Sequence, residues 1–177
     1  VENLESKRQL VARIDAGRKP DSIIATNTSG IPIKDISANC STSFKQHFLG
    51  THFFNPPRYL KLLEVIPGPE TSREVVDFMT DFGATVLGKG VVLCKDRPNF
   101  IANRLGTYLG MVGLRYAFDN DYAVNEVDDF TGPLIGRPKT STFRLLDLVG
   151  NDIMLHVADN LYVAVPNDES REELKVP

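Results

Sequence analysis

The chain has 177 residues, of which 42% are hydrophobic and 24% charged, a composition typical of a folded globular protein and unlike that of a disordered chain. This length is enough for one ordinary domain or two small ones. The net charge of -3 provides no overall attraction to nucleic acid or to an anionic membrane, and no apolar run approaches the roughly 20 residues of a membrane helix, so we expect neither partner.

Two cysteines and three histidines limit the cross-links and metal sites that the chain can form. Cys40 and Cys94 do not belong to a Cys-x-x-Cys pair, so we interpret both as structural free thiols in a reducing, cytoplasmic compartment. His47, His52 and His156 lack the spacing of zinc ligands. We therefore expect no disulfide and no metal site.

Helices and strands alternate in the first half of the sequence. The expected elements are a helix at 2–17, a strand at 22–27, a short helix at 31–36, strands at 48–54 and 60–66, a helix at 71–82, and one or two strand segments within 85–95. The first helix is predicted from an apolar stripe that includes Leu10 and Ile14. This order of elements is typical of an open parallel α/β sheet.

A short break separates the strands at 48–54 and 60–66, and it favours an antiparallel pair. If the hairpin is centred on Arg58 without a bulge, His52 lies opposite Glu64, since each is six residues from the centre. Cross-strand Cβ atoms are about 5 Å apart, within reach of a carboxylate–imidazole hydrogen bond. Such a pair fixes one tautomer and stabilises the imidazolium, as a general base requires. The alternatives are a hydrogen-bonded core histidine and a solvent-facing glutamate.

The segment Asp96-Arg97-Pro98 is the expected domain boundary, because proline restricts the preceding residue and cannot continue a strand ladder. Beyond it we expect a long helix at 99–118, shorter helices at 124–131, 142–149 and 151–163, and no strand. The predicted domains are therefore an α/β domain at 1–97 and an all-helical domain at 98–177.

Two further polar residues have positions suited to ligand binding. Ser29 follows an apolar strand, where open α/β sheets bind ligands, although a turn serine is the simpler interpretation. Asn103 lies near the start of the long helix, where it is either a donor to a substrate oxygen or an ordinary polar helix residue. No Gly-x-Gly-x-x-Gly occurs in the chain, so no motif by itself indicates a dinucleotide site.

Several segments, in this order along the chain, together resemble the NAD-dependent L-3-hydroxyacyl-CoA dehydrogenase family. They are Ala25–Ser29, Gly50–Pro56, Lys61–Val65 and Lys95–Arg104, with weaker likeness at Val1–Lys7 and Phe143–Gly150. The resemblance covers nearly the whole chain. It implies an α/β plus all-α fold, namely the C-terminal part of a Rossmann-like NAD-binding domain followed by a helical domain.

The resemblance also implies roles for individual residues. His52 would be the base that takes the proton from the substrate 3-hydroxyl, and Glu64 would orient it. Ser29 and Asn103 would hold the substrate oxygen and the acyl-CoA. The residues implied to contact the nicotinamide half of NAD are Glu2, Lys7, Ser29 and Asn55, and Asn55 is also implied in substrate binding.

The family pattern further implies the setting of this chain. A homodimer through the helical domain and a role in fatty-acid beta-oxidation are expected. Residues 136–166 resemble longer members that are fused to an enoyl-CoA hydratase region. The helical pattern at the start and the charged stretch at the end predict a fragment, with the Gly-rich loop and the acidic ribose-binding residue before Val1 and a family lysine beyond Pro177.

Three departures from the family pattern stand near the proposed site. The chain has Asn99 where the family has glycine, and Gly30 where a second serine is common. Two extra residues lie between Ser29 and His52. The loop after Ser29 is therefore expected to differ in shape.

Two other functions are compatible with this sequence. The chain could be an inactive dimerisation or docking module of a larger fatty-acid oxidation protein, because its helical half has enough apolar positions for a partner surface. A relative that oxidises small 3-hydroxy acids would resemble it in fold but would carry a lysine on the long helix. No lysine occurs between residues 96 and 138, which ranks that alternative low.

Overall fold

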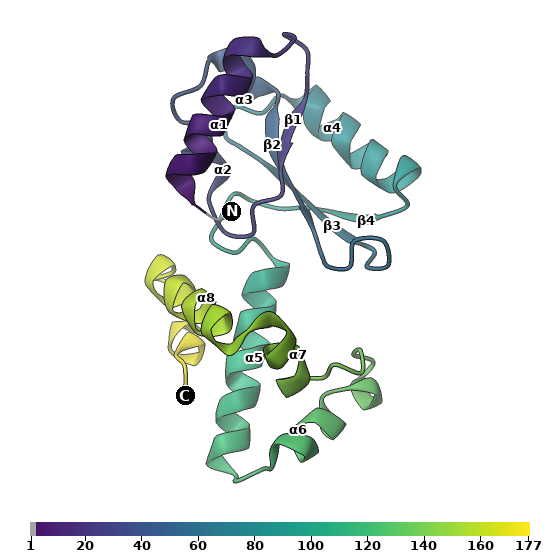
Figure 1. Ribbon diagram of the computed structural model, residues 1–177, viewed down its shortest axis with the longest axis vertical. Coiled ribbons are helices and arrows are strands. Elements are labelled where there is room, and N and C mark those ends of the chain that lie inside the picture. Colours follow the sequence, from purple (N-terminus) through teal and green to yellow (C-terminus); the bar gives the residue numbers. More distant parts are fainter. Residues whose placement is uncertain (1–2) are drawn as a thin grey trace. The chain divides into compact units, whose positions relative to one another are not determined.

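The computed structural model describes residues 3–177, in which two compact units follow one another along the chain (Figure 1). The first unit ends at Ile101 and contains every strand of the described chain, and the second spans Ala102–Pro177 and is helical. The change from mixed to helical structure therefore falls close to Pro98. No helix in the described part of the chain has both the length and the apolar character to cross a membrane.

A four-stranded sheet with the order β1-β2-β3-β4 forms the centre of the first unit. The strands are β1 (Ile24–Thr26), β2 (Phe48–Phe53), β3 (Leu62–Pro67) and β4 (Gly90–Leu93). β1 and β2 are parallel, as are β3 and β4, whereas β2 and β3 form the expected antiparallel pair. The α/β expectation for this half is confirmed, with one antiparallel junction inside a parallel-dominated sheet.

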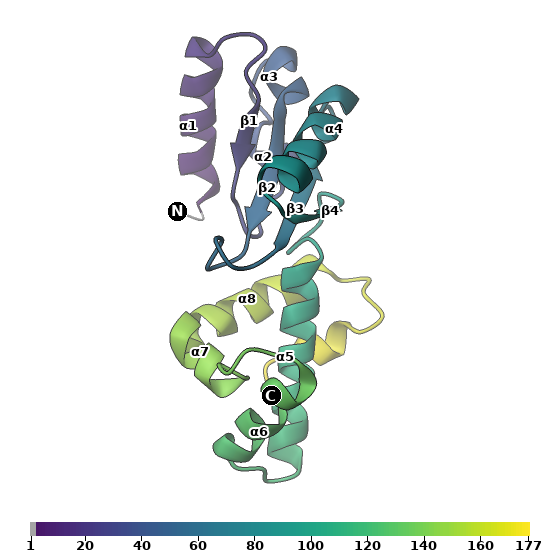
Figure 2. The same ribbon diagram turned by 90° about the vertical axis from the view of Figure 1, so that its right-hand side faces the viewer.

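Helices cover both faces of the sheet, and Figure 2 shows α1 and α4 on opposite sides of it. The helices of this unit are α1 (Leu4–Gly17), α2 (Ile33–Ile36), α3 (Thr42–Gln46), α4 (Arg73–Asp81) and the π-helical turn η1 (Phe82–Val86). Phe48 joins the buried cluster that contains residues of α1 and α2, and the next residue, Leu49, joins the cluster that contains Val75 of α4. Because side chains alternate along a strand, His52 lies on the same face as Phe48.

The second unit is an assembly of helices around α5. Its elements are α5 (Ala102–Asp119), α6 (Val124–Phe130), η2 (Pro133–Ile135), α7 (Phe143–Val149), α8 (Asn151–Ala164) and η3 (Arg171–Leu174). Met111 and Leu114 of α5 pack with Ala158 of α8 in a buried cluster. The buried carboxylate of Asp128 accepts the backbone N–H groups of Thr142 and Phe143 at 3.0 and 2.7 Å, which holds the start of α7.

The structure corrects two expected boundaries and adds one helix that the sequence did not predict. The long helix begins at Ala102 rather than at 99, because Asn99 and Phe100 have φ values of 58° and 51°, outside the helical region. The helix α3 was not predicted, although Ser41 has the signature of an N-cap and accepts from the N–H of Phe44 at 3.1 Å. The strand expected within 85–95 is confined to β4, because η1 extends the preceding helix.

Candidate functional site

The centre of the candidate site is a buried pair formed by His52 of β2 and Glu64 of β3. The two residues are cross-strand partners in the antiparallel ladder, as their spacing predicts. His52 Nδ1 lies 2.7 Å from Glu64 Oε2, and the two residues are 4% and 0% exposed. Because Glu64 accepts at Nδ1, the ring nitrogen that remains to exchange a proton with a ligand is Nε2.

Glu64 is held by donors on its other oxygen as well. The backbone N–H of Ile101 donates to Oε1 at 3.1 Å, and the thiol of Cys94 lies 3.5 Å from the same atom. Burial, together with the charge and hydrogen bond of Glu64, raises the pKa of Cys94 to about 12. A buried carboxylate with several donors is stabilised in its ionised form, which is the form that supports an imidazolium.

Two phenylalanine rings fix the orientation of the imidazole. The centroid of the Phe54 ring lies 4.5 Å from that of the His52 ring, with an angle of 61° between the ring planes. The centroid of the Phe100 ring lies 5.7 Å from that of the His52 ring, with an interplanar angle of 60°. Both contacts are edge-to-face arrangements, which aromatic rings favour. The imidazole is therefore held by Glu64 along its plane and by apolar rings across it.

The loop after β1 reaches the same edge of the sheet as the end of β2, since the two strands are parallel. Asn27 Oδ1 accepts the N–H of Phe53 at 2.8 Å and so ties the two strand ends together. Thr28 is fully buried, and its Oγ1 accepts the N–H of Ile31 at 3.2 Å. Ser29 is half-buried between these anchored positions.

The other predicted site residues occupy several parts of the chain. Asn55 is exposed and lies two residues after the end of β2, before the cis peptide bond to Pro56. Lys7 is half-buried on α1, and Glu2 lies outside the described residues. Asn103 is half-buried near the start of α5, in the second unit. The structure thus brings His52 and Glu64 into contact and places Ser29 and Asn55 after neighbouring parallel strands.

Asp96 is a supporting residue that sequence reasoning treated only as part of a domain boundary. Its two carboxylate oxygens accept the N–H groups of Ile33 and Lys34 at 2.9 and 3.0 Å, which caps α2. The segment after β4 is thereby joined to the segment after β1. An acidic residue that caps a helix can be recognised from sequence when it lies next to the start of that helix. Asp96 lies 63 residues after Ile33, so its role as a cap could not be recognised.

The residues at this edge fit the nicotinamide half of a dinucleotide. Ser29 and Asn55 offer a hydroxyl and an amide, groups that can both donate to and accept from a carboxamide. The buried Nδ2 of Asn99 also has no hydrogen-bond partner within residues 3–177, so a polar donor remains to be satisfied. The glycine-rich loop that would hold a diphosphate does not occur in this sequence.

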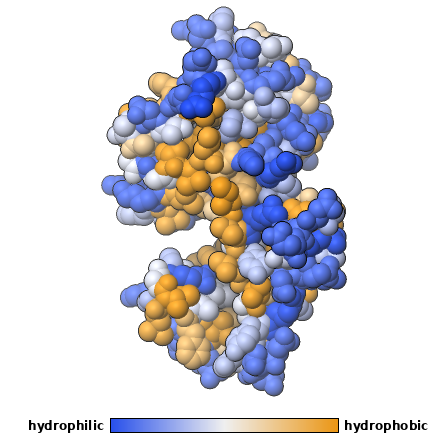
Figure 3. All heavy atoms as spheres, turned by 180° about the vertical axis from the view of Figure 1, so that it is seen from behind, coloured by the Kyte–Doolittle hydropathy of each residue, from blue (hydrophilic) through white to orange (hydrophobic). Residues whose placement is uncertain are grey.

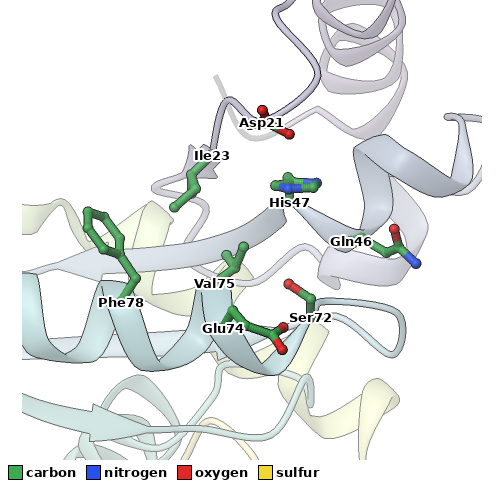
Figure 4. Close-up of a pocket in the computed structure, with 8 residues that line it drawn as sticks. All are labelled: Asp21, Ile23, Gln46, His47, Ser72, Glu74, Val75 and Phe78. Atoms are coloured by element: carbon green, nitrogen blue, oxygen red, sulfur yellow. The ribbon is translucent and has the colours of Figure 1, made fainter.

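A hollow of about 560 Å³ lies at the opposite end of the sheet, where β2 begins (Figure 4). Its lining residues are Asp21, Ile23, Gln46, His47, Ser72, Glu74, Val75 and Phe78. Ligands of open α/β sheets bind beyond the carboxyl ends of the strands, and His47 precedes β2 whereas His52 lies near its end. The edge with His52 therefore fits the usual position of a ligand site in such a sheet, whereas this hollow lies at the other end of β2.

Comparison with protein families matches both halves of the chain. Residues 1–97 match the family described as "3-hydroxyacyl-CoA dehydrogenase, NAD binding domain". Residues 100–176 match the "3-hydroxyacyl-CoA dehydrogenase, C-terminal domain".

Similar curated proteins are considerably longer than this chain. A Bacillus subtilis (strain 168) protein named "Probable 3-hydroxyacyl-CoA dehydrogenase" is 55% identical over 177 residues, which are 100% of this chain and 22% of that protein. A Rickettsia felis protein named as a fatty acid oxidation complex trifunctional enzyme is 39% identical, over 99% of this chain and 24% of its own length. The human mitochondrial hydroxyacyl-coenzyme A dehydrogenase is 39% identical, over 90% of this chain and 49% of its own length. The chain thus spans from about a fifth to about half of these relatives.

Solved structures share the fold over the same extent. FadB2 of M. tuberculosis superimposes with a TM-score of 0.86 at 31% identity, covering 100% of this chain and 60% of that one. The (S)-3-hydroxybutyryl-CoA dehydrogenase of Ralstonia eutropha superimposes with a TM-score of 0.85 at 27% identity, covering 99% and 59%.

Proposed function

We propose, from the premise that this chain belongs to the 3-hydroxyacyl-CoA dehydrogenase family, that its protein oxidises the 3-hydroxyl of an L-3-hydroxyacyl-CoA to the 3-oxo group with NAD. The observation that carries the proposal is the 2.7 Å contact between His52 and Glu64 on adjacent strands. The names of the relatives support the substrate class, and the description of the first matching family as an NAD binding domain supports the cofactor.

The geometry supports a role for His52 as the general base. Its Nδ1–H donates to Glu64, which leaves the lone pair of Nε2 to take the proton of the substrate hydroxyl. The charge that develops on the imidazole is stabilised by the carboxylate 2.7 Å away. When bound, NAD supplies the acceptor for the hydride that leaves carbon 3 of the substrate.

We assign the remaining predicted residues to binding. Ser29 and Asn55 are proposed to position the nicotinamide and the substrate, since each follows one of two neighbouring parallel strands. Asn103 is proposed to hold the substrate oxygen from the start of α5. Lys7 and Glu2 are proposed contacts of the nicotinamide half.

The test is the His52→Gln substitution in the intact protein, with NADH formation followed on an L-3-hydroxyacyl-CoA. We expect turnover to fall by about 10²-fold or more, because glutamine cannot act as a base. His156→Gln is the matched control, since His156 is exposed on α8 and should leave the rate unchanged. Near-normal turnover of a correctly folded His52→Gln variant would refute the assignment.

We further propose that the family's two domains meet at the segment expected from the sequence, with 1–97 as the nucleotide-binding part and 98–177 as the helical part. The family matches support this division, because one ends at 97 and the other begins at 100. A place in fatty-acid beta-oxidation is supported by the naming of the Rickettsia felis relative. The free cysteines support a cytoplasmic location.

A homodimer through the helical unit is also proposed. Apolar side chains lie at the surface of the helical unit (Figure 3). Among the most exposed are Leu109 at 66%, Leu134 at 77%, Leu148 at 73% and Val163 at 73%. Exposed apolar area of this kind is a common feature of association surfaces. The inactive docking module is the weaker hypothesis, because docking alone does not require a buried carboxylate–imidazole pair.

A further inference from the structure

Cys94, interpreted from the sequence as structural only, lies directly against the carboxylate of the candidate site. It follows β4, which pairs in parallel with β3, and the residue is 3% exposed. Its Sγ is 3.5 Å from Glu64 Oε1, the oxygen that does not contact His52. The thiol and the imidazole therefore contact opposite oxygens of one carboxylate.

The thiol is the donor in this contact, because an ionised carboxylate can only accept. The pKa of Cys94, raised to about 12 by burial and by Glu64, keeps the proton on sulfur at neutral pH. A second acceptor, the carbonyl oxygen of Val92, lies farther away at 3.7 Å. The charged and nearer oxygen of Glu64 is the stronger acceptor of the two.

We propose that Cys94 is a positioning residue for the His52–Glu64 pair: its S–H group and the N–H of Ile101 hold Oε1 and set how much negative charge Glu64 presents to the imidazole. Each donor withdraws charge from the carboxylate and fixes its rotation, so that Oε2 faces Nδ1. The catalytic consequence of this inference rests on the proposed function, whereas the hydrogen bond itself does not.

The contacts of Glu64 determine the direction of the expected effect. The titratable groups against it include His52 from β2 and Cys94 from the end of β4, while Phe100 and Ile101 bring no ionisable side chain. Removal of the thiol concentrates charge on Glu64, which then stabilises the imidazolium more strongly. The imidazole consequently keeps its proton to a higher pH.

The first test is the S–H stretching vibration of Cys94, isolated as the infrared difference between the intact protein and its Cys94→Ala variant. We expect this band to move to higher frequency in Glu64→Gln, because a neutral amide is a weaker acceptor than a carboxylate. A band that does not respond to Glu64→Gln would overturn the proposal. This readout needs no turnover, so it decides the inference even if the dehydrogenase assignment fails.

The second test is the pH dependence of kcat/KM for oxidation. In Cys94→Ala the acid limb of the kcat/KM profile should move to higher pH by about half a pH unit. The value of kcat/KM at neutral pH should fall about 2- to 10-fold, which corresponds to the loss of one hydrogen bond. Cys94→Ser, which keeps a donor, should lie closer to the wild type. Val91→Ala is the control, because it removes side-chain volume from β4 without contacting Glu64. Cys94 does not position the His52–Glu64 pair if the acid limb of the pH profile is unchanged in Cys94→Ala, or if Val91→Ala shifts that limb equally.

Discussion

The side chain of Asn99 lies against the backbone of Gly30, so closely that a Cβ atom on Gly30 would be 3.0 Å from Asn99 Oδ1. Asn99 has a φ of 58°, a conformation that glycine adopts most easily and asparagine tolerates. The sequence resemblance gives a residue exchange at these two positions, with Gly30 where a second serine is common in the family and Asn99 where the family has glycine. The two departures therefore form a single contact beside Ser29.

This contact predicts energetic coupling between the two positions. Gly30→Ser alone should lower the free energy of unfolding by about 1 kcal/mol, because the new side chain displaces Asn99. The effect should be largely relieved in the Gly30→Ser/Asn99→Gly double variant, where the space is vacated. Urea unfolding of the wild type, both single variants and the double variant measures the coupling, which we expect to exceed about 0.5 kcal/mol. Additive effects would show that the two positions are independent.

Glu64→Gln tests the electrostatic half of the candidate site. Glutamine keeps the shape and an acceptor for Nδ1–H but loses the charge that stabilises the imidazolium, so turnover should fall by about 10²-fold. The acid limb of the rate profile should move to lower pH, because an imidazolium without its carboxylate loses its proton more readily. Steady-state kinetics across pH measures both effects. Glu70→Gln, an exposed position after β3, should change neither.

The contact between His52 and Glu64 could be predicted from sequence because it depends on local geometry. The spacing of His52 and Glu64 about Arg58 determines their register once the segment between them forms a hairpin without a bulge. The contact of Cys94 with Glu64 could not be predicted, since it depends on which strand pairs with β3 and in what register. Asn99 was expected to start the long helix, but its left-handed backbone conformation, in a segment that lies against Gly30, leaves it outside that helix.

Gly50 controls how closely α2 approaches the sheet near the site. A Cβ atom at this position would lie 2.9 Å from Ile33 Cδ1 and 3.1 Å from Ile66 Cδ1, and both isoleucines are fully buried. Gly50→Ala should therefore lower the free energy of unfolding by about 1–3 kcal/mol, because the new methyl group would also lie 3.2 Å from Ile66 Cβ and both buried isoleucines would have to shift. Gly17→Ala at the end of α1, where nothing lies within 4 Å, should be neutral or slightly stabilising. Thermal and urea unfolding of the two variants provide the comparison, and equal effects would contradict the packing argument.

Asp168 provides a pH-dependent tie between α5 and the segment before η3. Hydrogen bonds from the Arg104 guanidinium and then from the N–H of Ser170, the latter at 2.8 Å, hold the pKa of Asp168 below its usual value despite partial burial. Because the folded-state pKa is lowered, this stabilisation is fully present above the unfolded pKa of about 3.9 and is lost as pH falls through the lower native value. The stabilisation from the interaction between Arg104 and Asp168 should be below about 1 kcal/mol, since the Arg104 side chain is 36% exposed and its charge is screened by solvent.

Asp168→Asn should consequently lower the Tm at pH 7, and the difference from the wild type should shrink as the pH is lowered below about 4. The matched control is Asp159→Asn, since Asp159 is an aspartate on the exposed surface of α8. Thermal unfolding monitored by circular dichroism between pH 3 and 7, about the range over which carboxylates titrate, measures both variants. A Tm difference for Asp168→Asn that is constant across this range would mean that the residue contributes through packing, because a charged tie to Arg104 must weaken once the carboxylate is protonated.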